Sequence, residues 1–172
     1  MVEAAGSEMV KLQCSEDEII NVDKADAEAS TLIKGLIDDG GADDPDQPIP
    51  IPQVSASVMQ KCMVFVSHMR STGQEPEIEQ PLPSNDLSQH VEAWYSEYIT
   101  KDVDQALLFD IVLAANYLDI KPLLKLGSAK IASLIKGKSI EEIRQFFQMD
   151  NDFTPEEEAR IREENQFAAE YF

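Results

Sequence analysis

The chain has 172 residues, 43% of them hydrophobic, and a formal net charge of −19 at pH 7. This length corresponds to about one domain, or one domain with an appendage, and allows a substantial buried core. Binding to nucleic-acid phosphates or to anionic lipid surfaces needs clustered Lys and Arg, so the charge argues against both. It favours solubility and encounters with basic partners instead.

The start of the chain predicts neither export nor membrane anchoring. MVEAAGSEMV has no basic region and no long apolar run, and no later window reaches the ~18 consecutive apolar residues of a membrane span. We expect residues 1–8 to form a disordered tail. Two cysteines, Cys14 and Cys62, are too few for a secreted disulfide framework, which favours free thiols and a cytoplasmic and nuclear location.

Two short strands open the predicted domain. In residues 10–14, VKLQC, apolar and polar residues alternate with the period of a half-buried strand, and residues 19–22 supply a second strand after a turn. A helix is expected over residues 24–37. The acidic stretch 38–47, DDGGADDPDQ, predicts a solvated loop, and because its Asp spacing does not match a calcium loop we expect no metal there.

The middle of the chain mixes extended and helical segments. PIPIPQV, residues 48–54, predicts an edge strand or extended segment, because proline has no N–H to donate to a sheet. A helix is expected over 55–70. Residues 71–86 contain three prolines and four acids and predict a disordered acidic loop, followed by a short helix over 90–99.

The second half of the chain is predicted to be helical. DQALLFDIVLAANYL, residues 104–118, is apolar nearly all round and predicts a central helix. Proline is tolerated in the first turn of a helix but not in its interior, so Pro122 indicates a second helix that begins near residues 120–122 and runs to Gly137. The order of short strands and helices without a βαβ repeat predicts an α+β fold.

Two further helix starts are marked by capping boxes. Ser139-Ile-Glu-Glu142 fits the S-x-x-E pattern, and Thr154-Pro-Glu-Glu157 fits T-x-x-E with proline at the first helical position. In each pattern the hydroxyl accepts from an unpaired amide and the Glu side chain reaches back to the capping residue, which stabilises the helix start.

No group of residues in the sequence predicts catalysis. The glycine-rich phosphate loops, the G-x-S-x-G elbow and the H-E-x-x-H helix motif do not occur. Nothing near His68 or His90 in the sequence resembles a nucleophile–base pair, so surface or capping roles are expected. We therefore expect no enzyme activity, no metal and no cofactor, and a function carried by a binding surface.

The C-terminal segments contain more apolar residues than short peripheral helices need. These residues are Ile140, Ile143, Phe146, Phe147 and Met149 in one short helix, and Phe153, Ile161, Phe167, Tyr171 and Phe172 in the charged segment that follows. Two explanations remain open at this point. Either the residues form a surface that a partner covers, or the helices fold back on the main domain.

Three blocks resemble the S-phase kinase-associated adaptor family: VDQALLFDIVLAANYLDIKPLL (103–124), IASLIKGKSIEEIRQFF (131–147) and NDFTPEEEARIREENQF (151–167). Members of that family are small acidic subunits of SCF-type ubiquitin ligases that join a cullin to an F-box substrate receptor. The resemblance covers residues 9 to about 167. It implies a POZ-type domain with a small three-stranded sheet over 9–136, F-box-binding helices over 137–172, and no catalytic activity.

The resemblance also implies two separate binding surfaces. Asn116 and Tyr117 match a pair that faces the cullin in the family, whereas the residues alone would favour Asn116 as a helix cap. The F-box surface is expected at Leu124, Ile131, Ile135, Ile143, Phe146, Phe153, Asn165 and Phe167. We expect this C-terminal region to be mobile alone and ordered in a complex.

Several positions depart from the family pattern. Phe167 stands where the family usually has Trp, and KLGSAK after Leu124 replaces a usually acidic run. Gly127, within KLGSAK, weakens a helix by about 1 kcal/mol relative to Ala. The departures indicate a divergent member with an altered F-box preference. Pro155 is a candidate for modification, because the matching proline is hydroxylated and glycosylated in some protist members.

Two other functions remain open for this fold. The first is a structural POZ scaffold that acts outside any ligase and forms a homodimer when no F-box protein is bound. The second is a transcription-elongation adaptor of the elongin C type. It is disfavoured because that family lacks the two C-terminal helices predicted within 139–172.

Overall fold

The computed structural model describes residues 8–41, 44, 47–79 and 81–165. The chain divides into two compact units, Met1–Leu134 and Ile135–Phe172, each of which is treated by itself below. A three-stranded sheet with many helices confirms the α+β prediction. No helix in the described ranges is long and apolar enough to cross a membrane.

The sheet is ordered β2-β1-β3. Strand β1 (Met9–Gln13) pairs antiparallel with β2 (Ile19–Asp23) and parallel with β3 (Ile49–Pro50), so that Leu12 lies beside both Ile20 and Ile49. The inward side chains of the three strands are buried, as the alternating pattern predicts. The edge position of β3 is also confirmed, and it suits proline, which cannot donate to a neighbouring strand.

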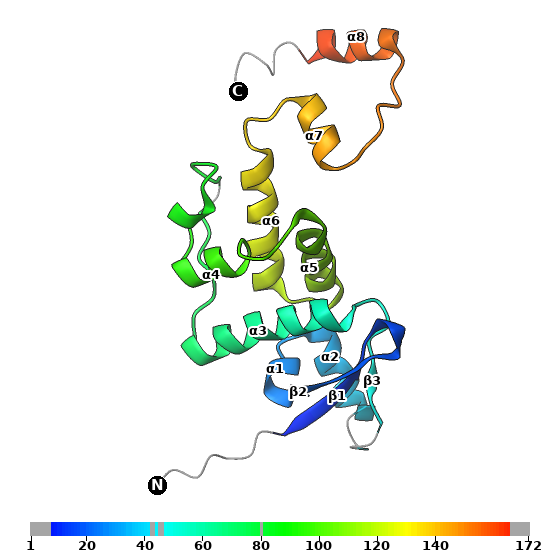
Figure 1. The fold of residues 1–172 in the computed structure, drawn as a ribbon, viewed down its shortest axis with the longest axis vertical. Coiled ribbons are helices and arrows are strands. Elements are labelled where there is room, and N and C mark those ends of the chain that lie inside the picture. Colours follow the sequence, from blue (N-terminus) through cyan, green and yellow to red (C-terminus); the bar gives the residue numbers. More distant parts are fainter. Residues whose placement is uncertain (1–7, 42–43, 45–46, 80, 166–172) are drawn as a thin grey trace. The chain divides into compact units, whose positions relative to one another are not determined.

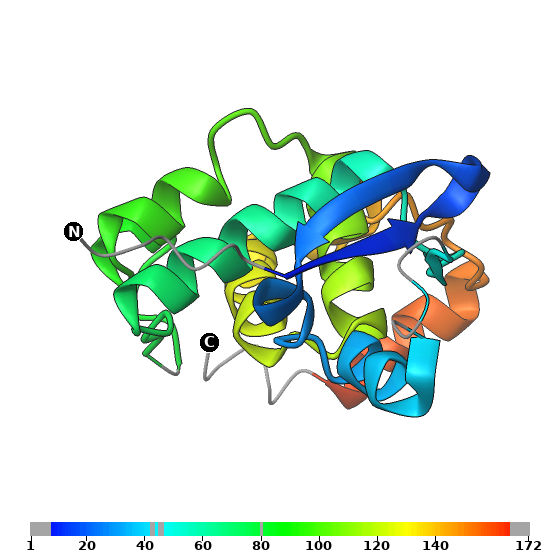
Figure 2. The same cartoon turned by 90° about the horizontal axis from the view of Figure 1, so that it is seen from below.

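The helices of the first unit follow in chain order. They are α1 (Lys24–Ala27), α2 (Thr31–Leu36), the single π-type turn η2 (Ile37–Gly41), α3 (Ala56–Thr72), the short η3 (Leu87–Gln89), α4 (Ala93–Tyr98), α5 (Gln105–Tyr117) and α6 (Lys121–Ile135). The hairpin between β1 and β2 contains the short η1 (Ser15–Asp17). Figures 1 and 2 show α3 between the sheet, with α1 and α2, and the pair α5 and α6.

The single helix predicted over residues 24–37 is wrong: the structure has two short helices with a break before Ser30. Ser30 caps α2, because its hydroxyl accepts from the Ile33 amide at 3.1 Å. The same hydroxyl donates to the carbonyl of Leu118 at 2.6 Å, 88 residues further along the chain. This buried tertiary contact explains the break, since a continuous helix would carry Ser30 away from Leu118.

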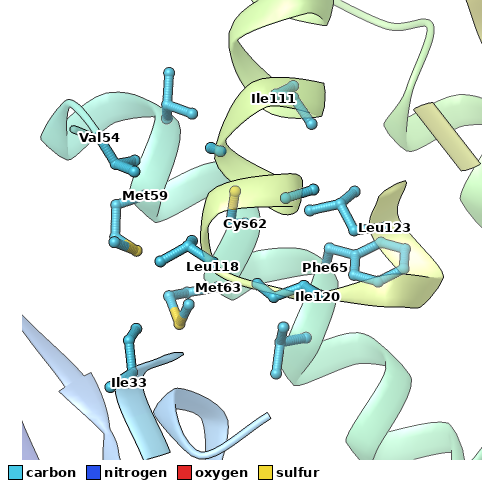
Figure 3. Close-up of a cluster of buried hydrophobic side chains, with 14 of the residues drawn as sticks. Ile33, Val54, Met59, Cys62, Met63, Phe65, Ile111, Leu118, Ile120 and Leu123 are labelled. Carbon is cyan, nitrogen blue, oxygen red and sulfur yellow. The ribbon is translucent and has the colours of Figure 1, made fainter. Parts of the chain in front are cut away.

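Buried side chains from the strands and helices form the core of the first unit, and Figure 3 shows the part contributed mainly by four helices. Ile33 of α2 and Met59 and Cys62 of α3 lie against Ile111 of α5 and Leu123 of α6, all fully buried. Both cysteines are buried and free. Burial raises the pKa of the Cys62 thiol to about 12, which makes it an inert packing residue.

The segment between α3 and α4, predicted from its composition as a disordered acidic loop, makes several contacts with the domain. Pro76 is buried, and Ile78 and Leu82 pack against the core. The Tyr95 hydroxyl donates to the carbonyl of Gln74 at 2.6 Å. The few apolar residues of this acidic segment are therefore its contact points with the domain, although the described residues form no helix or strand over 74–79.

The second unit contains α7 (Ile140–Phe146) and α8 (Pro155–Glu164). Both predicted capping boxes are confirmed, with Ser139 accepting from the Glu142 amide at 3.2 Å and Thr154 accepting from the Glu157 amide at 3.3 Å. In turn, the Glu142 carboxylate accepts from the Ser139 amide at 2.8 Å, and the Glu157 carboxylate accepts from the Thr154 amide at 3.0 Å. The hydrogen bonds that the two carboxylates receive from Ser139 and Thr154 lower the pKa of both carboxyl groups.

Candidate protein-binding surfaces

Helix α5 has one exposed face, although its sequence is apolar nearly all round. Leu108, Ile111 and Ala115 are buried, whereas Leu113 is 66% exposed. Leu113 has the largest exposed fraction among the large apolar side chains of the described residues. Helical spacing puts Asp110, Leu113, Asn116 and Tyr117 on neighbouring turns of one side, which we call the α5 face.

The structure does not support Asn116 as a helix cap. Helix α5 ends at Tyr117 with Leu118 as its C-cap, and within the described chain the Asn116 side chain makes no hydrogen bond. Its carbonyl accepts from the Asp119 amide at 3.2 Å, which any residue could do. Tyr117 is half-buried and packs against the core. An exposed amide beside an anchored aromatic ring is well placed to contact a partner.

Leu113 is the part of the α5 face that the sequence reasoning missed. Its distance of three residues from Asn116 and four from Tyr117 was the available signal, because residues at this spacing are neighbours on a helix. The sequence of α5 is apolar nearly all round, which predicts burial of every leucine in the helix, so the spacing of Leu113 from Asn116 and Tyr117 was overlooked.

The candidate F-box residues of α6 form a half-buried strip. Leu124 and Ile131 lie on one side of the helix, with Ile135 one turn beyond, and all three are partly exposed. We call them the α6 apolar strip. The adjacent side of α6 packs on α5 through Gly127, where a Cβ would approach Cγ2 of Val112 to less than 3.0 Å. The glycine thus permits the close approach of the two helices.

The second unit exposes many apolar side chains. Ile140 is 61% exposed, Met149 63% and Phe153 44%, while Ile143 and Phe146 are half-buried. The Arg144 guanidinium lies 5.7 Å from the Phe153 ring centroid and 3.6 Å from a Glu158 oxygen, which connects α7, the intervening loop and α8. This small unit therefore has organised contacts but leaves large apolar side chains uncovered.

The last candidate positions lie around α8. Asn165 is exposed, and its side-chain amide donates to the carbonyl of Ile161 at 2.8 Å. Pro155 is exposed at the first position of α8, as predicted. Phe167 lies outside the described residues. The sequence-predicted F-box residues are therefore grouped in two sets, one on α6 and one in the second unit.

Among the residues that the structure describes, neither histidine belongs to an arrangement suited to catalysis. His68 stacks on Trp94, with ring centroids 3.5 Å apart. His90 Nε2 lies 2.8 Å from the Ser84 hydroxyl, but its Nδ1 is 3.9 Å from an exposed Glu79 carboxylate, too far for a hydrogen bond that would orient a catalytic histidine. No group of three or more metal-binding side chains occurs among the described residues.

Comparison with family models matches most of both units. Residues 8–71 match the model described as "Skp1 family, tetramerisation domain", which is the POZ domain of that family. Residues 121–168 match the model described as "Skp1 family, dimerisation domain". The first match covers the sheet, α1, α2 and most of α3, and the second covers α6, α7 and α8.

Curated relatives align over nearly the whole chain. The S-phase kinase-associated protein 1 homolog of Tetrahymena thermophila is 48% identical over 96% of this chain and 96% of its own. The E3 ubiquitin ligase complex SCF subunit sconC of Talaromyces marneffei is 43% identical, over 94% and 98% respectively. Suppressor of kinetochore protein 1 of Schizosaccharomyces pombe is also 43% identical, over 92% and 96%.

Proposed function

Because the chain belongs to the Skp1 family, we propose that it is a non-catalytic adaptor subunit of an SCF-type E3 ubiquitin ligase. In this function it joins a cullin scaffold to F-box substrate receptors through separate surfaces, in the cytoplasm and nucleus. A relative named as an SCF subunit at 43% identity, aligned over nearly its full length, is the observation that carries the proposal.

The α5 face is the proposed cullin surface. It combines an exposed leucine, an exposed amide and a half-buried tyrosine on one side of a helix whose other side is fixed in the core. Interfaces commonly draw their binding energy from a few such aromatic and apolar side chains surrounded by polar ones.

We assign two sets of residues to F-box binding, the α6 apolar strip and the exposed residues of the second unit, each taken by itself. Their members are Leu124, Ile131, Ile135, Ile143, Phe146, Phe153, Asn165 and Phe167. The uncovered apolar side chains of α7 and the loop before α8 support this assignment, since exposed clusters of that kind usually mark a partner interface. Contact with a receptor would remove the apolar side chains of each set from water.

One pair of substitutions separates the two surfaces. Asn116→Lys with Tyr117→Lys should weaken binding of a cullin N-terminal domain at least about thirtyfold, because hot-spot residues are worth about 2 kcal/mol or more. Binding of a recombinant F-box domain should not change. Gln60→Lys with Val64→Lys, on the exposed side of α3, is the matched control and should leave both affinities intact.

The reverse test uses Phe153→Glu, which should weaken F-box binding and spare the cullin. Calorimetric titration of the full chain measures both affinities, and circular dichroism checks that each variant folds. If the α5 double variant lost both partners while remaining folded, the two surfaces would not be separate. If the unmodified chain bound neither partner, the adaptor proposal would fail.

The alternative is a self-associating scaffold that works without a ligase. The matched family descriptions contain the words tetramerisation and dimerisation, which supports testing self-association directly. Sedimentation of the full chain with and without an F-box domain distinguishes the two functions. The adaptor proposal expects any homodimer to dissociate when the F-box domain binds, whereas a scaffold would keep its oligomeric state.

A further inference from the structure

One stretch of this acidic chain holds five of its fourteen Lys and Arg residues. Residues 120–140 contain five lysines and no acid, although the chain as a whole carries a net charge of −19. The lysines are Lys121, Lys125, Lys130, Lys136 and Lys138. Helix α6 forms most of this stretch and has no acidic residue on any side.

Two of the lysines lie on the exposed side of α6. The residues of the helix that are exposed are Lys121, Lys125, Ser128 and Ala132, which repeat at intervals of three and four and therefore form one row. We call this row the lysine rim. Neither Lys121 nor Lys125 forms an ion pair within the described part of the chain.

The lysine rim borders the proposed F-box surface. At 100° per residue, Leu124 and Ile131 lie on α6 about 70–90° from the centre of the rim, so that the two rows are adjacent along the helix. If a partner helix packed its apolar face on the α6 apolar strip, the residues beside that face would lie against the lysine rim. The short side chains of Ser128 and Ala132 leave room for that approach.

We propose that the lysine rim is a specificity determinant that selects F-box segments carrying acidic residues beside their apolar face. This inference rests on the proposed adaptor function. Acids one turn apart on the partner helix would match Lys121 and Lys125, which are themselves one turn apart, about 6 Å along the axis. The rim is too small to hold a nucleic acid or a membrane against the repulsion of so many surrounding acids.

Complementary charges would act mainly on the choice of partner and on the rate of encounter. Exposed ion pairs contribute little each, so the apolar strip would supply most of the affinity and the rim would rank partners of similar apolar surface. Two such pairs correspond to a change in affinity of about three- to tenfold.

The test is a double-mutant cycle on the full chain. One partner is a recombinant F-box domain with Asp and Glu beside its apolar face, and the other is the same domain with those acids changed to Asn and Gln. The chain is used unmodified, as Lys121→Gln with Lys125→Gln, and as the control Lys34→Gln with Lys101→Gln. The control removes two exposed lysines of α2 and of the segment after α4, with the same change in net charge.

The proposal expects the acidic F-box domain to lose about three- to tenfold in affinity with the rim variant and to be unaffected by the control. The neutral domain should bind all three chains alike, and the difference should shrink as salt is added. Equal binding of the acidic domain to the rim variant and the unmodified chain overturns this inference and leaves the adaptor function standing. If the unmodified chain bound neither domain, both would fall.

Discussion

The contact between α5 and α6 can be tested at Gly127. A helical glycine normally costs about 1 kcal/mol relative to alanine, so Gly127→Ala would stabilise an isolated helix. In this structure the added Cβ would come within 3.0 Å of Cγ2 of Val112, and valine has one favoured rotamer in a helix, so the methyl group cannot easily rotate away. Overpacking of this kind costs about 1–3 kcal/mol.

The two effects oppose each other, and we expect the steric cost to be the larger one. Gly127→Ala should therefore reduce the free energy of unfolding by about 1 kcal/mol, measured by urea denaturation. Gly35→Ala is the matched control, because nothing lies within 4 Å of a Cβ built on that helical glycine, and it should stabilise the protein by up to about 1 kcal/mol.

A second substitution identifies the cause. The Cγ2 methyl of Val112 is the one nearby atom that would be closer to the added Cβ than an ordinary van der Waals contact. The next two atoms, the Cβ and Cα of Val112, would lie at ordinary distances of 3.7 Å and 4.0 Å. The double variant Gly127→Ala with Val112→Ala should thus recover at least about 1 kcal/mol relative to the sum of the single changes. If Gly127→Ala alone stabilised the protein as much as Gly35→Ala does, the close packing of α5 on α6 would be refuted.

Two further predictions concern the helix starts and the buried serine. The folded protein holds the pKa of the Glu142 and Glu157 carboxyl groups below their ordinary value of 4.5. The stability that these carboxylates contribute is therefore fully present above pH 4.5 and is lost as the pH falls through their lower pKa in the folded state. At pH values below about 4.5, protection against amide exchange in the first turns of α7 and α8 should therefore decrease. The double variant Glu142→Gln with Glu157→Gln should lose this dependence on pH. Unchanged protection in the unmodified chain at pH 3 would contradict the prediction. Ser30→Ala should reduce the free energy of unfolding, measured by urea denaturation, by about 1–3 kcal/mol, because it leaves the buried Leu118 carbonyl and the Ile33 amide unpaired. A reduction below about 0.5 kcal/mol would show that these two hydrogen bonds contribute little to stability.

Local signals in the sequence predicted the local structure well. The alternation around Leu12 gave the strands, and the two S/T-x-x-E patterns gave the starts of α7 and α8. The break at Ser30 could not be predicted, because its cause is a bond to Leu118 across 88 residues. Gly127 likewise appears in the sequence only as a weak helix former, since the reason for a glycine there is a side chain on another helix.

The candidate surfaces were predicted less evenly than the fold. Asn116 and Tyr117 came from a family resemblance, and the structure places them on an exposed side of α5 together with Leu113, which was overlooked. Composition indicated that the C-terminal apolar residues exceed what short helices bury, and Ile140, Met149 and Phe153 are indeed exposed. The lysine rim was not recognised, because a row of exposed residues becomes visible only once the buried side of α6 is known.

The turn between α5 and α6 sets the orientation of the α6 apolar strip relative to the α5 face. It consists of three residues, with Asp119 at a φ of 52° and the Ile120 amide donating to the carbonyl of Ala115 at 2.9 Å. One extra residue in this turn would swing the start of α6 by about 100° around its axis. Most surface loops absorb insertions and deletions, but here a single-residue change in length would re-aim the α6 apolar strip relative to the α5 face.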